Sequence, residues 1–159
     1  MSTYNAIFVR GGNGEVIARV KDRYPSASVE KGPRFLCIDV LPRDFDVPDD
    51  LLKELSMHGE VYWVTIQSAA ETFQYVHWDN GILRRALVYE HPNWVVVAGD
   101  PEPWERQAFF LDDFQQLPSW SKYHPNQNPE QKKPLSIGPD FIDSKDALHS
   151  VLGYYNFQN

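Results

Sequence analysis

A tight turn between two runs of alternating residues constrains the fold of this chain more than any other feature. The runs TFQYVHW (72–78) and ILRRALVY (82–89) flank Asp79-Asn80-Gly81, and WVVVA (94–98) follows the turn EHPN. Asn-Gly is the favoured pair for a two-residue type I′ turn, because both residues tolerate positive φ. Together with VYWVTIQ (61–67), this pattern predicts an antiparallel meander over 60–98.

The two-residue loop also predicts the register of the first hairpin. It places His77 opposite Arg84 and Val76 opposite Arg85, so the two arginines project to opposite faces. Both faces of the resulting ribbon carry apolar side chains. Each face therefore needs a cover: the N-terminal helices for one, and the C-terminal segment or a partner for the other.

Two helices are predicted before the meander. EVIARVKDRY (15–24) has apolar residues at helical spacing, and DVPDDLLKEL (46–55) combines Pro48 in the first turn with acidic residues and a leucine stripe. Gly59 is expected at the C′ position of the second helix. With strands at YNAIFV and RFLCIDV, we expect an α+β, two-layer domain: a mainly antiparallel twisted sheet with helices packed on one face.

The composition changes after residue 118. We expect a single α+β domain over 1–118, followed by a polar, Pro-rich and extended connector over 119–143. The segment 144–159 predicts an amphipathic helix with Ser144 as its N-cap. A helix this short is not stable alone, so it must dock on the domain or on a partner.

Charge and cysteine content exclude several kinds of partner and site. Fifteen Lys and Arg against 22 Asp and Glu give a formal charge of −7, which argues against nucleic acid. Cys37 is the only cysteine, which excludes an internal disulfide and a Cys-based zinc site and favours a reducing, cytoplasmic location. The five histidines show no metal-ligand spacing, and no stretch is long and apolar enough to span a membrane. We therefore expect no metal, no cofactor and no membrane contact.

Candidate binding residues lie on and just after the meander. His77 is the foremost acid–base candidate, beside Tyr75 and facing Arg84 in the predicted register. Pro101 and Pro103 are expected to hold the following backbone extended, which would direct Glu102 away from its acidic neighbours. No residue is predicted to be catalytic. The binding candidates are Tyr75, His77, Trp78, Arg84, Arg85, Trp94 and Trp104.

The segment IQSAAETFQYVHWDNGILRRALVY, with the later GDPEPWE, resembles a group of uncharacterised bacterial proteins. Those proteins share a hairpin of the form QS...F.F..W..G.L.R.L.Y followed by a GEPxPxE-like turn, in which this chain has Asp100 at the first Glu. The resemblance covers residues 60–106 and implies a shared hairpin architecture without a known activity. The matching positions are Gln67, Ser68, Phe73, Trp78, Gly81, Leu83, Arg85, Leu87, Gly99, Pro101, Pro103 and Glu105.

These observations favour a non-catalytic protein-binding module, such as a bacterial immunity or adaptor protein, whose partner is another protein or a second copy of the chain. One alternative is a small hydrolase or small-ligand-binding domain with a pocket near His77 and Arg84. A second alternative is a structural homodimer whose sheet is covered by an exchanged tail. The lack of a convergent catalytic set favours the non-catalytic hypothesis without deciding whether the chain is an enzyme.

Overall fold

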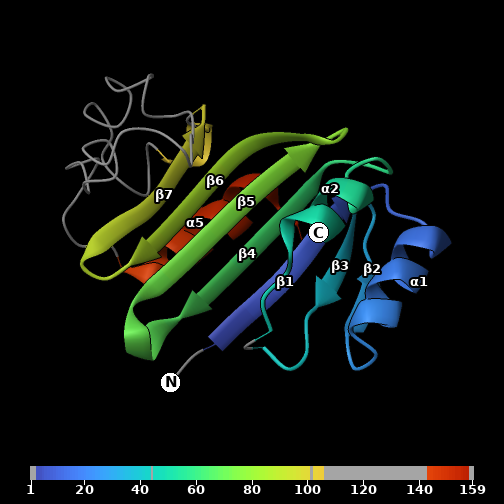
Figure 1. Cartoon of the computed structure of the whole chain (residues 1–159), viewed down its shortest axis with the longest axis horizontal. Coiled ribbons are helices and arrows are strands. Elements are labelled where there is room, and N and C mark those ends of the chain that lie inside the picture. Colours follow the sequence, from blue (N-terminus) through green and yellow to red (C-terminus); the bar gives the residue numbers. More distant parts are fainter. Residues whose placement is uncertain (1–2, 44, 101, 106–142, 158–159) are drawn as a thin grey trace.

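Seven antiparallel strands form one open sheet in the computed structural model of the chain, which describes residues 3–43, 45–100, 102–105 and 143–157. The order across the sheet is β2-β3-β1-β4-β5-β6-β7, so the meander β4–β7 fills one half (Figure 1). The strands are β1 (Thr3–Arg10), β2 (Ser28–Lys31), β3 (Phe35–Asp39), β4 (Val61–Gln67), β5 (Thr72–Asp79), β6 (Ile82–Glu90) and β7 (Asn93–Gly99). A short 3₁₀ turn, η1 (Ser68–Ala70), joins β4 to β5.

Two helices from the N-terminal half cover one face of the sheet, here called the front face. Helix α1 (Gly14–Arg23) begins at Asn13, whose side chain accepts the backbone N–H groups of Glu15 and Val16. Helix α2 (Asp49–Leu55) follows Pro48. Their apolar residues pack with alternate residues of β1, β3, β4 and β5 into a mainly aliphatic cluster. Its central members include Ile7, Val9, Val16, Val20, Leu52, Leu55, Trp63 and Val76.

Gly59 serves a purpose other than the predicted helix cap. Helix α2 ends at Leu55, four residues earlier, so Gly59 is not its C′ residue. A Cβ at Gly59 would lie 2.0 Å from the carbonyl oxygen of Arg10. The residue is therefore required for the close approach of the loop before β4 to the end of β1.

Helix α5 (Ser144–Tyr155) covers the opposite, rear face and packs on β4 and β5 (Figure 1). Its N-cap is Asp143, whose carboxylate accepts from the N–H groups of Lys145 and Asp146, and not the predicted Ser144. Val151 is fully buried, and the Phe157 ring stacks on Phe8 with centroids 4.1 Å apart. The C-terminal segment of the chain thus packs on the chain's own sheet.

The α+β class and the antiparallel meander are confirmed. Helix α5 adds a third layer on the rear face to the two layers formed by the sheet and the N-terminal helices. The physical reason is that both faces of the meander are apolar, so both are removed from water. Residues 119–142 of the predicted connector, and the boundary at 118, lie outside the described residues.

The predicted register holds only at the tip of the first hairpin. Trp78 pairs with Leu83, but the next pair is His77 with Arg85, so Arg84 is an extra residue that forms a β-bulge. A second bulge at Val95 shifts the β6–β7 register in the same way. Each bulge reverses the face to which the following residues of its strand point, relative to the predicted register. The predicted pairing of His77 with Arg84 is therefore wrong, and His77 pairs with Arg85.

The helices within the described part of the chain are too short or too polar to cross a lipid bilayer.

Candidate functional site

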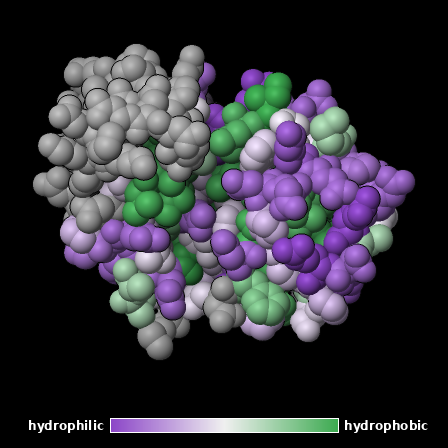
Figure 2. All heavy atoms as spheres, in the orientation of Figure 1, coloured by the Kyte–Doolittle hydropathy of each residue, from purple (hydrophilic) through white to green (hydrophobic). Residues whose placement is uncertain are grey.

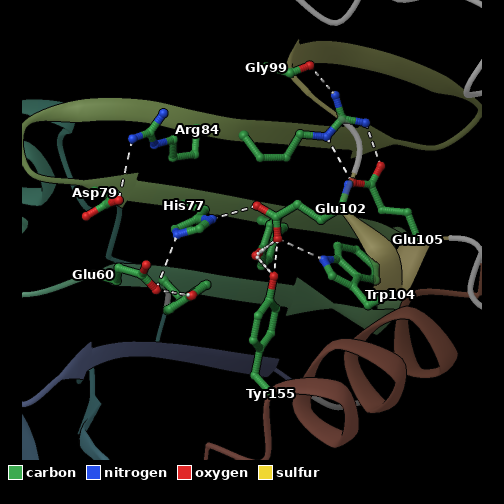
Figure 3. A network of polar contacts seen from close by, with 12 residues as sticks. Glu60, His77, Asp79, Arg84, Gly99, Glu102, Trp104, Glu105 and Tyr155 are labelled. Carbon is green, nitrogen blue, oxygen red and sulfur yellow. Dashed lines mark hydrogen bonds and ion pairs between the residues drawn. The ribbon is translucent and has the colours of Figure 1, made fainter.

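The carboxylate of Glu102 is the centre of a buried polar network on the rear face (Figure 3). Its Oε1 lies 2.7 Å from Nδ1 of His77, while its Oε2 accepts hydrogen bonds from the hydroxyls of Tyr75 and Tyr155. The indole Nε1 of Trp104 donates to the same Oε2 at 3.3 Å. One carboxylate therefore joins β5, the turn after β7 and helix α5. We call these five residues the Glu102 network.

His77 lies between two carboxylates. While Nδ1 contacts Glu102, Nε2 lies 3.9 Å from Oε2 of Glu60, which in turn accepts from the Tyr62 hydroxyl at 2.6 Å. The imidazole also stacks on the Tyr62 ring, with centroids 4.2 Å apart. The side chain of His77 is only 13% exposed, and its Nε2 is buried without a hydrogen-bond partner among the described residues. The ring is thus held on one side and in a fixed orientation.

The pKa values of this network favour an ionised acceptor and protonated donors. Burial raises the pKa of Glu102, but hydrogen bonds and the positive charge of His77, with the bonds from Tyr155 and Tyr75, bring it below its ordinary value. Burial and the charge of Glu102 raise the pKa of the Tyr155 and Tyr75 hydroxyls. At neutral pH the carboxylate therefore accepts from two phenols that keep their protons.

A buried ion pair adjoins the network. Arg85 and Glu105 are both fully buried, with Nε to Oε2 at 3.0 Å and Nη2 to Oε1 at 2.5 Å. Arg85 also donates to the carbonyl of Gly99 at 2.8 Å, and Glu105 accepts the backbone N–H of Glu102. This bidentate pair fixes the turn over 102–105 against β6. Burial raises the pKa of Glu105 to about 7 against the lowering effect of Arg85.

Gly99 is suited to this turn by its backbone conformation. Its φ is +80°, and a Cβ there would lie 1.9 Å from the carbonyl oxygen of Arg84. Glycine alone permits both the left-handed conformation and that approach. The chain can then leave β7 and return over β5 and β6.

The structure brings together some of the predicted binding residues and separates others. Tyr75, His77 and Trp104 meet in the Glu102 network, while Arg85 joins the adjacent ion pair. Arg84 lies on the surface, where its Nη2 is 3.5 Å from Asp79. These placements separate the two neighbouring arginines, one buried and one exposed.

The two remaining candidates are tryptophans in different environments. Trp94 is buried on the rear face, its ring edge-on to Tyr89 at 5.2 Å. Trp78 is half-buried on the front face. Neither tryptophan belongs to the Glu102 network.

The expectation of an extended backbone around Glu102 is wrong. Residues 103–105 form a helical turn in which Glu105 N–H donates to the Glu102 carbonyl at 3.0 Å, so the backbone is not extended. Pro103 favours this conformation because proline suits the first position of a helical turn. Sequence reasoning missed Glu102, Glu105, Tyr155 and Glu60 as members of the site. The one sequence signal for Glu105 is the shared motif, because Arg85 and Glu105 are both among its matching positions.

The Glu102 network is held together by hydrogen bonds, and its side chains are not arranged as the ligands of a metal ion. Within the described ranges, no group of three or more His, Cys, Asp or Glu side chains is arranged to hold a metal. The carboxylate–imidazole contact is the kind of pair that orients a general base. Here both partners are largely buried and serve to fasten helix α5 to the sheet.

A separate surface feature lies at the tip of the β5–β6 hairpin. Met57 and Ile82 are 61% and 53% exposed, and Trp78 and Leu83, a cross-strand pair of the same hairpin, are half-buried. Figure 2 shows hydrophobic surface near this end of the sheet. We call these four residues the tip patch.

Ser56 fixes the tip patch to helix α2. The N–H of Gly81 donates to Ser56 Oγ at 2.8 Å, and the N–H of Asn80 donates to its carbonyl at 3.1 Å. The sulfur of Met57 lies beside Gly81, where an added Cβ would be 3.1 Å away. Ser56 is buried and accepts hydrogen bonds from both turn residues, so it supports the exposed hairpin tip rigidly.

Comparison with known proteins places the chain in one family. No curated protein and no solved structure shows significant similarity to it. The family profile matches residues 23–154, which contain α2, the whole meander, the Glu102 network except Tyr155, and most of α5. The chain therefore belongs to the DUF6928 family of unknown function.

Proposed function

We propose that this protein is a non-catalytic protein-binding module that recognises its partner through the tip patch. The observation that carries the proposal is the exposure of large apolar side chains at one end of the meander. Met57 and Ile82 face solvent, and Trp78, in the same hairpin as Ile82, is half-buried. Methionine and tryptophan are enriched at protein interfaces.

The rim of the tip patch carries a charged group. Arg84, on its bulge next to Leu83, adds an exposed guanidinium at the rim of the patch. An apolar centre with a charged rim is the usual anatomy of an interface.

The contacts that the acid–base residues already make within the chain support a non-catalytic role. His77 is the foremost candidate base, but its Nδ1 and its ring face are used by Glu102 and Tyr62. Glu102 accepts four hydrogen bonds that hold together three parts of the chain. These groups support the fold of the rear face, which accounts for them without a substrate.

We further propose a bacterial, cytoplasmic setting, in which the module acts as an immunity or adaptor protein. The hairpin and turn motif shared with uncharacterised bacterial proteins supports the source, and the free Cys37 supports a reducing compartment. The formal charge of −7 favours a partner with a basic surface.

The test is site-specific cross-linking in the source organism. A photoreactive residue at Ile82 should give one dominant protein adduct, and the same residue at Val95 should not. Val95 is a matched control because it is a 52% exposed aliphatic residue at the other end of the hairpins. Ile82→Lys should abolish binding of the partner so identified, while Val95→Lys should retain it. Equal adducts at both positions, or none at Ile82, would overturn the proposal.

A further inference from the structure

A second part of the front face carries a regular array of neutral polar side chains. The register of β1, β4, β5 and β6 aligns residues in cross-strand rows. The row containing Trp63 and Val76 is apolar and belongs to the front core. The next row contains Asn5, Thr65 and Gln74, and the row beyond contains Gln67 and Thr72. Hydroxyl and amide groups thus follow one another at the spacing of adjacent strands.

One wall of this array is the loop before α2, whose described residues Arg43, Phe45 and Asp46 are held in place by buried side chains. Asn5 is 1% exposed, and its Nδ2 donates to the carbonyls of Arg43 at 3.1 Å and Phe45 at 2.6 Å. Its Oδ1 accepts from Trp63 Nε1 at 2.7 Å, which fixes the orientation of the amide. The Tyr24 hydroxyl donates to the carbonyl of Asp46 at 2.7 Å. Arg43, Phe45 and Asp46 are therefore held in position before any ligand binds.

Between the loop and the array lies a groove of about 490 Å³. The Phe45 ring contributes to its lining and remains 43% exposed, with the Tyr24 ring 5.7 Å behind it. Thr65, Gln67 and Gln74 lie along the floor. A groove of this size is within the range of small-ligand sites.

The chemistry of the groove selects among ligands. Hydroxyl and amide side chains both donate and accept, so they match a ligand whose groups do both. The floor strands are paired on both sides within the sheet, so their backbone is not free to bind a peptide as an added strand. Arg43 is paired with Asp39 at 3.6 Å, and Asp46 and Glu90 add negative charge to the lining. An anionic ligand is therefore disfavoured.

We propose that this groove binds a short neutral oligosaccharide, with sugar hydroxyls on Thr65, Gln67 and Gln74 and one sugar face on the Phe45 ring. Such a ligand needs side-chain hydrogen bonds and an aromatic wall, and it carries no charge for the acidic rim to repel. The site is separate from the tip patch and does not depend on the proposed partner.

The experiment is a titration of the full chain with uncharged hexasaccharides of glucose, xylose, mannose and N-acetylglucosamine, one at a time, followed by NMR. One of them should shift the side-chain amide signals of Gln67 and Gln74 and the ring signals of Phe45. Phe45→Ala and Gln74→Ala should each weaken the measured Kd about tenfold. Tyr154→Ala is the control, since Tyr154 is an aromatic residue of similar exposure on helix α5 and should leave the Kd unchanged.

The opposite results are equally definite. If no hexasaccharide shifts these signals at 10-millimolar concentration, roughly the weak limit of specific binding, the proposal fails. It also fails if binding is unaffected by both groove variants, or if a neutral peptide of similar length binds there and the sugars do not. Asn5→Ser should loosen the wall and weaken binding while the spectrum stays folded, which distinguishes a pre-organised site from simple surface contact.

Discussion

The two faces of the sheet are sealed by different chemistry. On the front face, helices close to the sheet strands in sequence bury an aliphatic cluster that includes Leu52 and Val76. On the rear face, a helix from the far end of the chain packs on aromatic rings and is joined to the sheet through Glu102. The front face depends on shape and area, whereas the rear face also depends on satisfying buried charges and hydroxyls.

The two faces should therefore respond differently to substitution, in how the loss of unfolding free energy depends on pH. Removing aliphatic volume leaves a cavity whose cost is independent of pH. Removing one member of a polar network leaves its partners buried without hydrogen bonds, and that cost depends on which of them are ionised. The following variants test the contrast.

The largest loss is expected for Arg85→Met, which leaves the Glu105 carboxylate buried without its partner. The free energy of unfolding should fall by about 4 kcal/mol. Urea denaturation measures this change. Arg84→Met is the matched control on the adjacent residue, and its exposed pair with Asp79 should contribute less than about 1 kcal/mol. Similar losses in both variants would contradict the distinction between the two arginines.

Leu52→Ala tests the front face. The side chain is fully buried between α2 and the sheet, so truncation should lower the free energy of unfolding by about 3 kcal/mol. Since the residue carries no ionisable group, the loss should be the same at neutral and at acidic pH. Urea denaturation at both pH values checks this, and a loss that varied strongly with pH would show that the front face is coupled to a titrating group.

Glu102→Gln tests the rear face and should show the opposite behaviour. The amide keeps one acceptor but places an NH₂ among donors, so about 2 kcal/mol should be lost at neutral pH. Because the folded pKa of Glu102 lies below its ordinary value of 4.5, the wild-type carboxylate stabilises the fold above 4.5 and loses that contribution as pH falls. The difference between wild type and variant should therefore shrink in acid.

Taking that difference is essential because Glu105 acts with the opposite sign. Its pKa is raised to about 7, so its contribution to stability is lost as pH rises from 4.5 to 7. Glu105 is present in both proteins, so its contribution cancels except for the part of its raised pKa that comes from the charge of Glu102. A difference between wild type and Glu102→Gln that is constant from neutral to acidic pH would show that Glu102 is not the titrating member of the network.

The smallest effect is expected for Tyr155→Phe, which removes one donor to Glu102 and keeps the ring. The free energy of unfolding should fall by about 1 kcal/mol. Amide hydrogen exchange should accelerate more in helix α5 than in the front-face helices, relative to wild type. Tyr154→Phe is the control, because Tyr154 is exposed at the preceding position of the same helix. Equal exchange rates in the two variants would remove Tyr155 from the fastening of α5.

The local elements were predictable because their signals are local. Asn80-Gly81 indicates a tight turn, and Asn80 and Gly81 do adopt positive φ. Alternation predicts the strands of the meander, and the leucine stripe with Asp49 and Asp50 predicts α2. The register failed at Arg84, since a bulge has no reliable signal in one sequence. The Glu102 network could not be predicted from the sequence, because residues 75, 77, 102, 104 and 155 meet only after the chain has folded.

The class of the fold follows from the amino-acid sequence, because period-two alternation and helical spacing act over a few residues. The sequence also established that both faces of the meander are apolar and that the C-terminal helix needs a surface. Tertiary structure alone decided that α5 is the cover of the rear face, and that Arg85 is buried while Arg84 is exposed. One inserted residue in β6 inverts which side chain faces the core, and only the packed molecule selects the position of that insertion.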